Sequence, residues 1–87
     1  MILELLSLPA TIWITYPLLE ETIVEQVCVM EATYDECGYK SIKYRDSTGN
    51  LLCWNRKYSN VQLFRTKQRA IDSIGNNNYY IKAPLVI

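Results

Sequence analysis

The hydrophobic and polar positions of this chain alternate over several short segments, a pattern typical of β-strands. Residues 11–16 are β-branched or aromatic throughout and predict a first strand that ends at Pro17. Four more strands are predicted downstream, and Gly, Ser, Asn and Asp residues between them supply short turns. These strands are expected at residues 21–34, 39–46, 51–55 and 59–64.

The longest predicted strand, residues 21–34, has two possible inward faces. One consists of Val24, Cys28, Met30 and Ala32, and the other of Ile23, Val27 and Val29. A β-bulge that switches faces within the strand would reconcile them.

The expected hairpin between residues 31 and 43 matches both charge and hydrophobicity. A turn near residues 36–37 sets Glu31 opposite Lys43, where opposite charges stabilise a strand pair by about 0.2–1 kcal/mol. The same register predicts Ala32 opposite Ile42 and Met30 opposite Tyr44 on the other face.

A short helix is predicted over residues 66–75. Thr66 is suited to the N-cap, Ala70, Ile71 and Ile74 form a buried stripe, and Gly75 with the asparagines after it ends the helix. Residues 79–87 then return as an edge strand or form an apolar tail, and residues 1–9 form an N-terminal arm that packs on the core.

These elements predict one domain of the α+β class, mainly β. The expected architecture is a small SH3-like barrel, or a curved antiparallel sheet of about five strands, with one short C-terminal helix. At 87 residues the chain buries only roughly 60% of its unfolded surface, which leaves little room for an enclosed catalytic cleft.

The residues that usually carry catalysis or bind metal are sparse. The chain has no histidine and no glycine-rich phosphate loop, so we expect no enzyme activity and no cofactor or metal. The three cysteines form no Cys-x-x-Cys motif. We expect Cys28 and Cys53 to be buried as small hydrophobic residues, and Cys37 to be exposed in a turn.

The net charge of zero conceals two oppositely charged halves. Residues 1–38 carry only acids and have a net charge of −7, whereas residues 39–87 have a net charge of +7. Such a split indicates either complementary charges that meet inside one fold or an interaction surface. A further interpretation is that the acids form a ridge of carboxylates that mimics nucleic-acid phosphates. This ridge would consist of Glu20, Glu21, Glu25 and Glu31.

Basic residues cluster around the predicted start of the helix. The positive end of the helix dipole disfavours basic residues, so helix stability alone does not explain why they are there. With an exposed tyrosine from the preceding turn they form the predicted partner-binding set, which consists of Arg56, Lys57, Tyr58, Arg65, Lys67 and Arg69. The partner would be an acidic protein surface or, alternatively, the phosphates of a nucleic acid.

Residues 61–70, Val-Gln-Leu-Phe-Arg-Thr-Lys-Gln-Arg-Ala, carry a resemblance to known proteins. The segment resembles small phage, plasmid and bacterial proteins in which an SH3-like sheet ends in "apolar-Phe-x-Thr-Lys-x-x-Ala" and leads into a short helix. In that pattern the residues after Thr-Lys are commonly acidic, whereas here they are Gln68 and Arg69. The resemblance implies the fold and a setting in a phage or other mobile element.

Together these observations predict a non-enzymatic protein-binding module. With the resemblance, they favour an inhibitor of a host factor such as a bacterial defence component, of the anti-CRISPR type. A nucleic-acid-binding accessory protein is the alternative, and head-to-tail homo-oligomers are a third possibility. No apolar run approaches the ~20 residues of a membrane helix and the first residues lack a secretory signal, so we expect a cytoplasmic location without membrane contact.

Overall fold

The structure is a computed structural model, and it describes residues 8–82. In chain order its elements are β1 (Ala10–Leu18), β2 (Glu21–Asp35), β3 (Gly38–Arg45), β4 (Leu51–Asn55), β5 (Gln62–Phe64), α1 (Lys67–Ile74) and β6 (Tyr79–Lys82). The predicted mainly β fold with one short helix is confirmed. Most of the expected N-terminal arm (residues 1–7) and the last part of the expected tail (residues 83–87) lie outside the described residues.

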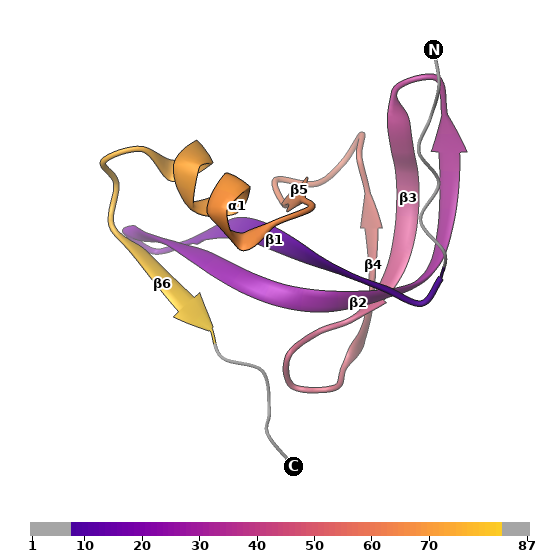
Figure 1. Cartoon of the computed structure of the whole chain (residues 1–87), viewed down its shortest axis with the longest axis horizontal. Helices are drawn as coiled ribbons and strands as arrows, with labels where there is room; N and C mark the ends of the chain where they lie inside the picture. Colours follow the sequence, from indigo (N-terminus) through magenta and orange to yellow (C-terminus); the bar gives the residue numbers. More distant parts are fainter. Residues whose placement is uncertain (1–7, 83–87) are drawn as a thin grey trace.

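The strands form one curved sheet around the long strand β2 (Figure 1). The order is β4-β3-β2-β1-β5, and these neighbours are antiparallel. The first half of β2 also pairs with β6, in parallel, after α1 has brought the chain back to the start of β2. Within the described residues β4 and β5 do not pair, so of the two expected architectures the curved open sheet is the one found.

The predicted bulge in β2 is confirmed, and it changes one predicted pair. Val29 pairs with Tyr44 and Glu31 with Lys43, so Met30 is the extra residue and is exposed. The expected Met30–Tyr44 pair is therefore wrong. Beyond the bulge Glu31 and Ala32 lie opposite Lys43 and Ile42, as predicted.

The main core lies on the inner face of the curved sheet. Its buried residues are Ile12, Ile14, Val27, Val29, Ile42, Tyr44 and Trp54. The Trp54 indole Nε1 donates a hydrogen bond of 2.8 Å to the carbonyl oxygen of Val61, which fastens the β4–β5 connection to this core.

A second, smaller core lies on the opposite face of β1 and β2, where α1 packs. Val24, Ala70 and Ile74 are its buried residues, and Trp13, Phe64 and Ile81 pack against them. Both candidate faces of β2 are therefore used. The helix begins as predicted, because the Thr66 hydroxyl oxygen accepts from the Arg69 backbone N–H at 3.1 Å, and Gly75 (φ 69°) follows its end.

Two of the predicted strands, β1 and β5, differ from their predicted ranges by more than one residue at one end. β1 continues through Pro17 to Leu18, because β5 pairs only with residues 13–15 and proline is tolerated where a strand edge is free. β5 is limited to three residues, since residues 59–61 belong to the connection that Trp54 holds. No helix within residues 8–82 is long and apolar enough to cross a membrane.

One carboxylate of β2 lies inside the molecule. Glu25 is only 2% exposed, and its Oε2 accepts hydrogen bonds of 2.8 Å from both the N–H and the hydroxyl of Ser47. Its Oε1 accepts from the Tyr16 hydroxyl at 2.8 Å. The alternative of an exposed carboxylate ridge is therefore wrong at Glu25, which instead anchors the β3–β4 turn.

Candidate protein-binding surface

Arg56, the first predicted binding residue, has a partner within the chain. Its guanidinium makes a two-pronged ion pair with Asp35, at 2.9 Å from Nη1 to Oδ1 and through Nη2 to Oδ2. This guanidinium, together with the Cys37 N–H, lowers the pKa of Asp35 from 3.8 to about 2. Arg56 thus ties the end of β4 to the β2–β3 hairpin.

Lys57 and Tyr58 follow in the β4–β5 connection. The Lys57 ammonium lies 5.6 Å from the centre of the Tyr58 ring, a cation–π contact. Tyr58 is 80% exposed, as expected for a residue at a turn. The contact of these two side chains with a partner remains a prediction.

Arg65, Lys67 and Arg69 are all exposed at the start of α1, and the first turn of the helix contains no acid. The Lys67 ammonium lies 5.8 Å from the centre of the Trp13 ring, which directs it over the second core. The role of this cluster in binding stays a prediction.

The two charged halves of the chain meet inside the fold. Three ion pairs form within residues 8–82, and each joins an acid of the first half to a base of the second. They are Glu31–Lys43 (3.3 Å), Asp35–Arg56 and Glu25–Lys82 (3.9 Å). Complementary pairing therefore accounts for part of the charge split.

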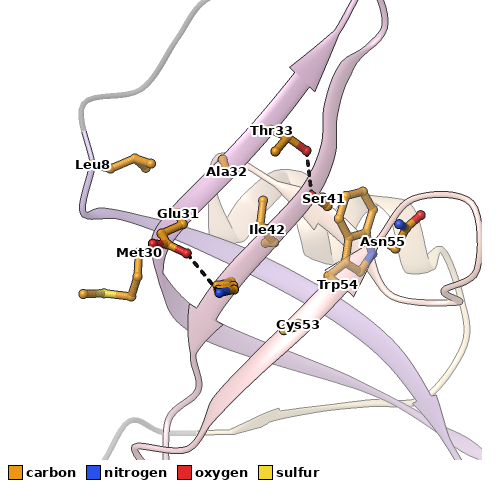
Figure 2. A pocket seen from close by; sticks show the side chains of 11 residues that line it. Leu8, Met30, Glu31, Ala32, Thr33, Ser41, Ile42, Cys53, Trp54 and Asn55 are labelled. Carbon is orange, nitrogen blue, oxygen red and sulfur yellow. Dashed lines mark hydrogen bonds and ion pairs between the residues drawn. The ribbon is translucent and has the colours of Figure 1, made fainter.

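A hollow of about 660 Å³ lies along β2, β3 and β4 (Figure 2). The pairing register puts two rows of side chains on the face opposite to the buried Ile42 and Trp54. One row is Glu31, Lys43 and Cys53, and the next is Thr33, Ser41 and Asn55. The Thr33 and Ser41 hydroxyl oxygens are 2.6 Å apart. We call this hollow the outer groove, and Leu8 and Met30 line its apolar end.

One long border of the outer groove is β4, which has a free edge. The Asp46 N–H donates to the Asn50 oxygen and the Arg56 N–H to the Lys40 oxygen, so even-numbered positions of β4 face β3. The backbone groups of Leu51 and Cys53 therefore face away from the sheet, and no described residue pairs with them.

Side chains around this edge are more exposed than predicted. Leu51 is 57% exposed, Leu52 is 41% exposed, and Cys53, which was expected to be buried, is exposed. Leu51 and Cys53 lie on the face opposite to the core that buries Trp54, and Leu52 lies on the core face at the edge of the sheet. Cys37 is exposed as expected, and Cys28 is intermediate.

The residues of β4 do not mark it as an edge strand. Native edge strands are commonly protected by lysine, proline or another charged residue. The segment Leu51-Leu52-Cys53-Trp54-Asn55 contains none.

A second overlooked feature is the tip of the β1–β2 hairpin. Leu19 is 98% exposed and has a positive φ of 56°, a region where leucine is strained. Asparagine or glycine is the usual residue in such a turn. Its neighbour Leu18 is 54% exposed.

Comparisons with known proteins give no match. No protein-family model, curated protein or solved structure is significantly similar to the chain.

Proposed function

We propose that the protein is a non-enzymatic protein-binding module that adds an extended segment of its partner to the free edge of β4. The observation that supports this most is the combination of an unpaired edge with exposed apolar residues and no charged or proline residue in the strand. An edge of this kind promotes unwanted pairing between chains unless a partner covers it.

The edge offers a partner both hydrogen bonds and side-chain sites. The N–H and C=O groups of Leu51 and Cys53 form the backbone ladder, as in other cases of strand addition. Alternate side chains of the added segment then lie over the outer groove and over the inner side of the sheet.

The partner that we propose is a bacterial host protein, which the module inhibits by covering it. This part of the proposal is supported by the resemblance of residues 61–70 to small phage and plasmid proteins. The small size of the chain and its polarised charge agree with it. A defence component is the kind of host factor that such a module would block.

The experiment compares Cys53→Pro with Cys53→Ala as bait in a bacterial lysate. Proline at position 53 removes the N–H that faces the free edge and leaves the ladder with β3 complete. Alanine removes the thiol but keeps that N–H. We expect the wild type and Cys53→Ala to retain the same stoichiometric partner, and Cys53→Pro to lose it.

Equal capture by all three proteins would refute strand addition at β4. Thermal unfolding of Cys53→Pro checks that the variant is folded before the comparison is made.

The nucleic-acid alternative relies on the basic set that includes Lys57, Arg65, Lys67 and Arg69. Phosphate contacts are strongest at low salt, so a salt-titrated binding assay with DNA and RNA tests it directly. Absence of binding at low salt removes this alternative.

Light scattering at low and high salt tests the homo-oligomer, since charge-driven association weakens as salt rises.

A further inference from the structure

A second cavity, of about 310 Å³, lies where the curved sheet stays open. Leu52 of β4 borders it on one side, and Asn60 and Val61 of the β4–β5 connection border it on another. We call it the seam cavity. A segment added to the free edge of β4 would pass beside its mouth, because Leu52 belongs to that strand.

Five polar residues line the seam cavity: Tyr16, Glu25, Tyr44, Asp46 and Asn60. The Glu25 carboxylate is fixed by Tyr16 and Ser47, as described above, and the Lys82 ammonium approaches it to 3.9 Å. Two carboxylates therefore face one neighbouring ammonium group, and Lys82 itself does not line the cavity.

The Tyr44 hydroxyl keeps a hydrogen-bonding capacity that no residue in the described part of the chain uses. The residue is only 6% exposed, yet its hydroxyl has no hydrogen-bond partner among residues 8–82. Tyr44 lines the cavity together with Glu25 and Asp46, and burial, followed by the charges of these two carboxylates, raises the pKa of Tyr44. This hydroxyl can accept a hydrogen bond inside the cavity.

Asp46 also keeps one oxygen without a partner in the described part of the chain. Its Oδ1 accepts from the Thr48 N–H (2.9 Å), the Thr48 hydroxyl (2.7 Å) and the Asn50 N–H (2.9 Å), whereas Oδ2 accepts none. Burial alone would raise the pKa of Asp46, but these hydrogen bonds outweigh it and the pKa is lowered. Asp46 is therefore held as a carboxylate.

We infer that the seam cavity binds an organic cation, namely the lysine or arginine side chain of the partner segment that lies on β4. Carboxylates attract the cation, the Tyr44 hydroxyl accepts one of its N–H donors, and the rings of Tyr16 and Tyr44 contribute cation–π attraction. A volume of about 310 Å³ is at the small end of ligand sites, which suits one long side chain. The inference rests on the proposed function, because the cation belongs to the bound segment.

The test is an NMR titration of the ¹⁵N-labelled protein with n-butylammonium at constant ionic strength. Methylguanidinium is the second probe and separates an arginine-type from a lysine-type site, and 1-butanol is the neutral control. We expect saturable shifts around Tyr16, Tyr44 and Ser47 with at least one cation, and none with 1-butanol.

Two variants and a matched control locate the site. We expect Tyr44→Phe and Asp46→Asn each to raise the dissociation constant at least threefold. Tyr39→Phe should leave it unchanged, because the Tyr39 hydroxyl is also buried without a hydrogen bond in the described structure but lies outside the cavity lining. If Asp46→Asn does not fold, the dissociation constant of Tyr44→Phe alone tests the site.

Equal shifts with 1-butanol, or no saturable shift with either cation, would overturn the inference. Cys53→Pro should still bind the cation, because it changes only the strand edge. Failure of strand addition and failure of the cation site are therefore distinguishable.

Discussion

Replacing Trp54 by phenylalanine probes the contact that holds the open sheet together. Trp54 is 7% exposed, and its indole N–H donates to the Val61 carbonyl at 2.8 Å. Loss of this hydrogen bond costs about 0.5–1.5 kcal/mol. The smaller ring removes buried carbon equivalent to roughly two methylene groups, which costs about 1.5 kcal/mol more.

We therefore expect Trp54→Phe to lower the free energy of unfolding by about 2–3 kcal/mol. For a domain of this size that corresponds to a melting temperature lower by roughly 10–20 °C. Urea unfolding followed by far-UV circular dichroism gives the free energy, and a thermal scan gives the melting temperature.

Trp13→Phe is the matched control. The Trp13 indole is half-buried, makes no hydrogen bond within residues 8–82 and contacts Lys67 only through its ring. We expect this variant to lose about 1 kcal/mol or less. If Trp54→Phe were no more destabilising than Trp13→Phe, the claim that the Trp54–Val61 hydrogen bond fastens the open side of the sheet would be refuted.

Three further predictions concern other contacts. Because the pKa of Asp35 is about 2 in the folded chain against 3.8 ordinarily, its ion pair stabilises the fold above about pH 4 and loses this effect as the pH falls towards 2. The stability difference between wild type and Arg56→Met should shrink over that interval in urea titrations, and a constant difference would contradict it. Thr66→Ala should cost about 0.5–2 kcal/mol through loss of the N-cap, measured by thermal unfolding, and an unchanged melting temperature would count against the cap. Leu19→Gly should raise the melting temperature by a few degrees, since glycine adopts a positive φ without strain, and a lower value would show that the turn does not strain Leu19.

Local sequence patterns were sufficient for much of the fold. Alternation located the strands, Thr66 and Gly75 marked the limits of the helix, and charge together with hydrophobicity gave the Glu31–Lys43 pair. These features depend on residues close in sequence or on direct cross-strand neighbours, so a single sequence contains them.

Features that depend on distant contacts were harder to predict. The bulge was anticipated, but its position at Met30 was not, and the Met30–Tyr44 pair was wrong for that reason. Burial of Glu25 depends on Ser47 in a separate turn, and exposure of Cys53 depends on which face of β4 packs on the core. Both depend on contacts between separate elements.

The candidate site shows the same division. The predicted basic residues near α1 are exposed, but Arg56 is occupied by Asp35. No residue of β4 marked it as an edge strand, because the strand has neither the lysine nor the proline that commonly protects an edge. The seam cavity required the positions of side chains from β1, β2, β3 and the following turn.

Hydrogen exchange at the amides of β4, with and without the captured partner, tests strand addition most directly. The Leu52 and Trp54 amides face β3 and should be protected in the free protein, whereas those of Leu51 and Cys53 face the free edge and should exchange quickly. On binding, we predict that the Leu51 and Cys53 amides become protected. Fast exchange at both positions in the saturated complex would contradict the proposal.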